Sequence, residues 1–233
     1  SLILQFFTLQ YGMISVIAKG IRKKSEKQQL LPLCEYELLA YEPKEQGLWL
    51  FSEANIIRNF SVYPGSATWA AAETGLELIS HLIIPQEDIA TIYNLTIAYL
   101  EYLKKVKSNA ILIFWRFFNR ITILSGIGNP LSNCCICNND LSLPSAYLKS
   151  KGGFVCENCL PEIYPNDALL ILSPPARKIL LLLPEIGNHL EEITLDRAVV
   201  NEINTAFALY WQTHHKQTLH LKGLSVLTQF YNA

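Results

Sequence analysis

The sequence predicts an α+β protein in two parts, with an N-terminal β module followed by a helical domain that carries a four-cysteine metal module. Short runs rich in β-branched and aromatic residues occupy about the first 60 positions, and apolar residues at helical spacing follow them. Two CxxC motifs interrupt the helical part. We therefore expect domains at residues 1–64 and 65–233, with the cysteine module at 130–162.

Four strands are expected in the first part, at residues 2–7, 13–19, 33–41 and 48–54. Four short strands without a covering helix close most simply as a small barrel, and the five-stranded oligonucleotide-binding (OB) barrel is the common form. Its first strand would lie upstream of Ser1, because the chain opens SLILQFFTL without a Met. The alternative is a four-stranded sheet packed directly on the helices.

Helices are expected after Pro64. Ser66 is the expected cap of the first helix, which the internal Gly75 should weaken, and Thr194 is the expected cap of a later one. The third helix is apolar nearly all round and should be central and buried. The expected helices cover residues 67–82, 87–107, 110–124, 176–183, a segment after 194, and 224–231.

Composition excludes several classes of protein. Hydrophobic residues make up 50% of the chain, which is enough for a real core and rules out disorder as the main state. Lys and Arg number 19 against 20 Asp and Glu, so the chain is not a uniformly basic nucleic-acid binder. No apolar run reaches the ~18 residues of a membrane span, and no signal peptide is visible. Phosphate-binding loops and common hydrolase motifs are also missing from the sequence, so we expect no enzyme activity.

Five of the six cysteines fall between positions 134 and 159. Cys134 and Cys137 form one CxxC pair and Cys156 and Cys159 form the second, at the spacing typical of a zinc site. Four thiolates fill a tetrahedral shell and leave no position for a reactive water, so the expected cofactor is one structural Zn²⁺. Free thiols or disulfides are the alternatives. Cys135 competes with Cys134 for the first pair, but a Cys135 pairing leaves only one intervening residue.

The segment around Pro130 to Pro161 contains little apolar material. We therefore expect it to depend on the metal for its order, since metal binding and folding are coupled in such modules.

One segment concentrates positive charge. AKGIRKKSEK follows the second expected strand and carries Lys19, Arg22, Lys23, Lys24 and Lys27 against one glutamate. A basic loop on a small barrel collects phosphates without reading base sequence. The alternative is an ordinary solvated loop.

Aromatic side chains near this segment are candidates for stacking on bases, although most such residues belong to a core. We expect no more than one or two of them to contact nucleic acid. The candidates are Phe6, Phe7, Tyr11, Trp49 and Phe51.

Nearly the whole chain resembles the RecO family of bacterial recombination mediators. LILQFFTLQYGMISVIAKGIRKKS is similar to the family's first barrel strands and basic loop, and ELISHLIIPQEDIATIYNLTIAYLEYL to the helices that follow. NRITILSGIGNPLSNCCICNNDL with KGGFVCENC resembles the helix and four-cysteine zinc module of the family. LHLKGLSVL resembles its LKSREL segment, with Gly223 and Leu224 in place of the serine and arginine.

The resemblance implies an N-terminal OB barrel, a helical domain with structural zinc, and a role in DNA repair. It implies binding of single- and double-stranded DNA, annealing of complementary strands, and cooperation with RecR and the single-stranded-DNA-binding protein in loading RecA. It also implies a bacterial cytoplasmic, nucleoid-associated protein. By position, Lys19, Arg22, Lys23 and Lys24 would contact DNA phosphates, and Cys134, Cys137, Cys156 and Cys159 would hold zinc.

Two other functions stay open. A zinc-stabilised helical interaction module without a DNA role would explain the cysteines and the neutral charge. A zinc enzyme would need an open position on the metal, for example for a water polarised by Glu157. Four sulfur ligands leave no such position.

Overall fold

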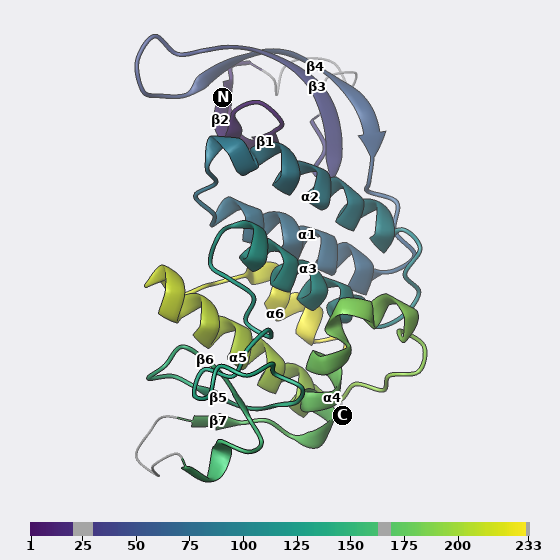
Figure 1. Cartoon of the computed structure of the whole chain (residues 1–233). Coiled ribbons are helices and arrows are strands. Elements are labelled where there is room, and N and C mark those ends of the chain that lie inside the picture. Colours follow the sequence, from purple (N-terminus) through teal and green to yellow (C-terminus); the bar gives the residue numbers. More distant parts are fainter. Residues whose placement is uncertain (21–29, 163–168, 232–233) are drawn as a thin grey trace.

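The computed structural model of the chain describes residues 1–20, 30–162 and 169–231. Figure 1 shows the N-terminal sheet at one end, helices stacked in layers beneath it, and a small second sheet at the other end.

The N-terminal sheet has the strand order β1-β2-β4-β3. β1 pairs antiparallel with β2, β4 pairs antiparallel with β3, and the central β2/β4 pair is parallel. Alternation of buried and half-buried residues along β2 shows why this segment is a strand. The expected strands are confirmed, except that β4 extends beyond its expected end. Their bounds are β1 (Leu2–Thr8), β2 (Gly12–Ala18), β3 (Cys34–Tyr41) and β4 (Trp49–Asn59).

The described residues form an open sheet and not a closed barrel. β1 and β3 lie at its two edges and each pairs with one neighbour.

Six α-helices follow in the described part of the chain, and the expected ones are confirmed to within a few residues. Their bounds are α1 (Ser66–Ser80), α2 (Ile89–Leu103), α3 (Ala110–Leu124), α4 (Pro174–Leu182), α5 (Arg197–His215) and α6 (Lys222–Thr228). Among the residues that the structure describes, no helix has the length and apolar character needed to cross a membrane.

Two expected helix caps were wrong. Gly65 caps α1, where its backbone N–H and C=O both bond to Thr68 Oγ1, and Ser66 is already helical. Asp196 caps α5, because its Oδ1 accepts a hydrogen bond of 2.8 Å from the Val199 N–H. Asp196 immediately precedes the helix, so its carboxylate reaches the first free N–H groups, whereas Thr194 lies too far upstream.

A second sheet in the C-terminal part was not expected. It consists of β5 (Pro144–Leu148), β6 (Gly153–Cys156) and β7 (Leu169–Ile171), in the order β6-β5-β7. Every residue of β5 is buried, so the strand shows no alternation of apolar and polar residues from which to predict it. Tyr147, Phe154 and Val155 are fully buried. The cysteine segment therefore adds to the core, contrary to the expectation that it lacks apolar content.

α3 is the centre of the helical part, as expected. Eleven of its fifteen residues are buried, and it packs on α1, α2 and the 3-10 helix η5 (Leu183–Asn188). Phe118 stacks on Phe207 of α5 with ring centroids 4.8 Å apart. Trp115 Nε1 donates a 2.8 Å hydrogen bond to Asn204 Oδ1, which satisfies the one polar group of this buried side chain.

Gly75 lets α1 and α2 approach closely. A Cβ at this position would overlap Cε1 of Tyr99 and lie 3.0 Å from its Cζ, which no ordinary contact permits. Tyr99 donates a 2.5 Å hydrogen bond to the Ala71 carbonyl and stacks on Phe117 with centroids 4.1 Å apart. The glycine that weakens the helix locally is therefore required by the packing of the helices.

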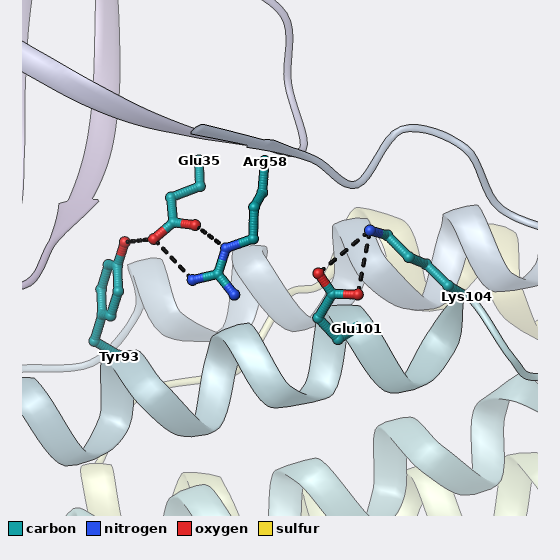
Figure 2. A network of polar contacts seen from close by, with 5 residues as sticks. All are labelled: Glu35, Arg58, Tyr93, Glu101 and Lys104. Carbon is teal, nitrogen blue, oxygen red and sulfur yellow. Dashed lines mark hydrogen bonds and ion pairs between the residues drawn. The ribbon is translucent and has the colours of Figure 1, made fainter. Parts of the chain in front are cut away.

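A polar network ties the N-terminal sheet to α2 (Figure 2). Arg58 on β4 makes two hydrogen bonds to the carboxylate of Glu35 on β3, one of them 3.2 Å long. The Tyr93 hydroxyl on α2 donates to the same carboxylate at 2.9 Å. Nearby, Lys104 pairs with Glu101 at 3.2 Å and lies 4.7 Å from the centre of the Phe60 ring.

Burial raises the pKa of Glu35, but the hydrogen bonds from Arg58 and Tyr93 outweigh it, so the pKa falls below its usual 4.5. The Glu35 side chain is only 10% exposed. The ionised carboxylate of Glu35 is therefore the form that joins the N-terminal sheet to α2.

Gly75→Ala should lower the free energy of unfolding by about 1–3 kcal/mol, because the overpacking against Tyr99 exceeds the ~1 kcal/mol that alanine adds to helix propensity. Urea unfolding measures the difference. Gly47→Ala is the matched control, since no heavy atom lies closer than 3.9 Å to its added Cβ. Equal stability of the two variants would contradict the close approach.

Glu35→Gln should lower the free energy of unfolding by about 1.5–3 kcal/mol at neutral pH, because hydrogen bonds to a charged group are removed. A group whose folded pKa is lowered stabilises the protein fully above its unfolded pKa of 4.5, and this contribution disappears as the pH falls through the lower folded value. The gap between variant and parent should therefore narrow as the pH falls below 4.5. The exposed Glu37 on the same strand supplies the control, Glu37→Gln; a gap that is constant with pH would refute the assignment.

Candidate metal centre and nucleic-acid interface

The first cysteine pair lies in a tight loop after α3. The Asn138 N–H bonds to the Cys134 carbonyl and the Cys134 N–H to the Asn139 carbonyl, both at 2.9 Å. Asn138 has a positive φ of 59°, which asparagine tolerates better than most residues. This loop turns Cys134 and Cys137 to the same side.

The second pair begins at the last residue of β6. Cys156 ends the strand, and the Cys159 N–H bonds back to the Cys156 carbonyl at 3.3 Å. The structure brings the sulfur atoms of Cys134, Cys137, Cys156 and Cys159 within 4.8 Å of one another.

These distances fit a tetrahedral metal. Zn–S bonds of ~2.3 Å place the sulfurs of a tetrahedral site about 3.8 Å apart. The Cys137 and Cys156 sulfurs are 3.9 Å apart, far beyond the ~2.05 Å of a disulfide. All six cysteines lie among the described residues and are free thiols. The cluster could hold a metal ion and is compatible with zinc.

The electrostatics of the cluster favour a bound cation. Burial raises the pKa of Cys134, but hydrogen bonds from the backbone N–H groups of Cys137, Cys156 and Ile136 overcome it and bring the pKa to about 6. Burial and the neighbouring thiols raise the pKa of Cys159. Negative charge on one sulfur therefore opposes ionisation of another, and a divalent cation would relieve this repulsion.

Cys135 lies outside this cluster. Its Cβ is 2.7 Å from where a Cβ on Gly153 would stand, so it packs against the start of β6. Burial raises its pKa to about 11, as expected for a packed thiol.

The cysteine module is fastened to the helices around it. Arg177 on α4 forms an ion pair of 3.7 Å with Glu157, which stands between the second pair of cysteines. The Tyr147 and Thr213 hydroxyls are 3.1 Å apart and link β5 to α5. Glu157, the residue considered as a catalytic carboxylate, therefore pairs with Arg177 in this structure.

The expected basic segment is only partly visible. Lys19 follows the end of β2 and is exposed. Arg22, Lys23, Lys24 and Lys27 lie outside the described residues.

The aromatic candidates divide into two groups. Tyr11 is 52% exposed, and its ring centre lies 4.9 Å from that of Trp49. Phe6 and Phe7 contact Tyr36 and Tyr93, and Phe51 is half-buried. The Tyr11/Trp49 pair therefore offers the more accessible stacking surface.

A cleft of about 1710 Å³ lies between the N-terminal sheet and the helices α1, α2 and α6. Both edge strands, β1 and β3, line it, a feature that local sequence patterns do not reveal. Glu73 and Glu77 also line the cleft. The pKa of Glu73 is raised, mainly by burial and to a smaller extent by the negative charge of Glu77. Carboxylates and apolar walls make this cleft unsuitable for phosphate groups.

Close packing of α6 on α1 leaves room only for a glycine at position 223. A Cβ at Gly223 would lie 2.6 Å from Thr74 Oγ1, and Glu77 accepts hydrogen bonds from the Lys222 and Gly223 N–H groups at 2.9 and 3.0 Å. α6 thus lies directly against α1 at a site where a serine would collide.

Comparisons with known proteins match both parts of the chain. The family model "Recombination protein O N terminal" matches residues 1–60, and "Recombination protein O C terminal" matches residues 66–222. The chain is 31% identical over 173 residues to the DNA repair protein RecO of Clostridium perfringens strain SM101, covering 71% of this chain and 75% of the relative. It is 27% identical over 236 residues to that of Syntrophus aciditrophicus, covering 98% and 89%. For Rubrobacter xylanophilus the identity is 26% over 168 residues, covering 71% and 67%.

Cys134→Ser should reduce bound metal from one ion per chain to well below one and destabilise the protein by about 3 kcal/mol or more, because a structural metal contributes directly to folding. Metal analysis of the purified protein and thermal unfolding test this expectation. Cys135→Ser, one residue away, should retain the metal. Equal metal content in both variants would contradict the assignment of the four sulfurs as the metal site.

Proposed function

The chain belongs to the RecO family, which acts in DNA repair and recombination, and from this membership we propose that it is a recombination mediator. It would bind single- and double-stranded DNA and anneal complementary strands. With RecR it would help RecA load onto DNA covered by the single-stranded-DNA-binding protein. The observation that carries the proposal is the match to both family models, in order, along the chain.

We propose that the basic segment after β2 contacts DNA phosphates through Lys19, Arg22, Lys23, Lys24 and Lys27. The exposure of Lys19 supports this, as does the exposed Tyr11, whose ring lies beside that of Trp49 on β4. Cations that hold the backbone and an aromatic face that stacks on a base are the usual combination for single strands.

The topology of the N-terminal sheet supports an OB barrel at residues 1–64, ahead of a helical domain at 65–233 with its metal module at 130–162. A strand placed between β1 and β3 would pair with both edges and close the sheet at five strands. The two edges border one cleft, so a single strand could reach both. Its pairing would also cover the free backbone groups of the edges.

We propose that Cys134, Cys137, Cys156 and Cys159 hold one Zn²⁺. Such an ion would cross-link the loop after α3 to the end of β6 and would have no open position for a substrate. The proposed role is therefore structural, and the protein acts as a mediator without catalysis, in the bacterial cytoplasm at the nucleoid.

The parent protein should speed annealing of complementary strands coated by the single-stranded-DNA-binding protein. Arg22→Ala/Lys23→Ala/Lys24→Ala should weaken single-strand binding, because fewer side chains neutralise the phosphates. The plot of log affinity against log salt should flatten by about 0.7 units for each phosphate group that the variant no longer neutralises. Fluorescence anisotropy at several salt concentrations measures the slope.

A parent protein that neither binds DNA nor anneals strands would overturn the function and favour a zinc-stabilised interaction module instead. A parent that anneals, together with a triple variant of unchanged slope, would overturn the assignment of the basic segment alone.

A further inference from the structure

Two segments of the chain contain basic residues and no acidic ones. Residues 142–155 contain Lys149 and Lys151, and residues 203–233 contain two lysines and three histidines. The chain as a whole has a net charge of −1, so its carboxylates are concentrated elsewhere.

The fold joins these two segments at the turn between β5 and β6. Gly152 closes this turn with a φ of 66°, and its N–H bonds to the Leu148 carbonyl at 2.9 Å. A Cβ on Gly152 would lie 2.6 Å from Thr213 Cγ2. The turn therefore lies directly against the last turn of α5.

Polar contacts hold the turn against the end of α5. His214 Nε2 lies 3.0 Å from the Gly152 carbonyl oxygen, and the Tyr147 and Thr213 hydroxyls meet at 3.1 Å. His215 stacks on Trp211 with ring centres 3.8 Å apart, which fixes the end of α5. The turn and the end of α5 are therefore packed and hydrogen-bonded to each other.

Three lysines surround the junction, and we call Lys149, Lys151 and Lys216 the basic corner. Lys149 and Lys151 flank the turn, and Lys216 is the residue that ends α5, with a φ of 55°. All three are exposed. The ion pairs found in the described part of the chain involve none of them.

The C-terminal dipole of α5 explains only part of this arrangement. It favours one cation such as Lys216 at the helix end. It does not require two further lysines on a neighbouring turn, where three like charges repel one another unless a polyanion is bound.

We propose that the basic corner binds the sugar-phosphate backbone of a nucleic-acid strand, as a second contact separate from the segment after β2; this rests on the proposed annealing function. Lysines act as flexible point charges and suit phosphate groups without regard to base sequence. In Figure 1 the helices α1, α2 and α3 lie between the N-terminal sheet and the β5/β6/α5 region. Contacts on both sides of this layer hold two strands at once, which annealing requires.

The test compares the parent protein with Lys149→Ala/Lys151→Ala. The matched control, Lys44→Ala/Lys104→Ala, removes the same charge from sites beside carboxylates, since Lys44 stands between Glu42 and Glu45 and Lys104 pairs with Glu101. Thermal unfolding and metal content establish that both variants are folded. Anisotropy of a labelled single strand at several salt concentrations and the annealing rate of two complementary strands are then measured.

The Lys149→Ala/Lys151→Ala variant, called the corner variant, should lower the slope of log affinity against log salt by about 1.4 units, for two phosphate groups at ~0.7 each. It should also slow annealing at least about fivefold. The control variant should match the parent in both measurements. A corner variant that matches the control in both measurements overturns the second contact while the parent still anneals. A parent that fails to anneal overturns the proposed function and this inference with it.

Discussion

The burial of α3 is the constraint on which the rest of the structure depends. Its apolar residues face neighbours on all sides, so α1, α2, α5 and η5 must surround it to exclude water. Aromatic stacking sets the detail of this packing, since Tyr99 lies against Phe117 on one side and Phe207 against Phe118 on the other. The sheet and the cysteine module are attached to this helical body.

The two attachments differ in chemistry. The N-terminal sheet is joined to α2 by the charged network around Glu35, which is partly exposed and responds to pH. The cysteine module is joined by buried strands, and its two CxxC pairs meet in the four-sulfur cluster.

Charge distribution, and not net charge, is what makes a DNA role compatible with this chain. A total of −1 predicts weak non-specific attraction to DNA if the charges are evenly mixed. In the fold, carboxylates line the cleft below the sheet, whereas lysines collect at the turn beside α5. Short screening lengths at cellular salt allow such patches to act independently.

The sequence by itself determined the local elements and the four cysteines of the cluster. Runs of β-branched and aromatic residues identified β1 to β4, apolar spacing identified the helices, and the CxxC spacing singled out the four cysteines that the fold brings together. Only the tertiary structure decided the second sheet, the need for Gly75 beside Tyr99, and the meeting of Gly152 with His214. The physical reason is that periodicity and ligand spacing are properties of neighbouring residues, whereas close approach and shared burial depend on how distant segments pack around α3.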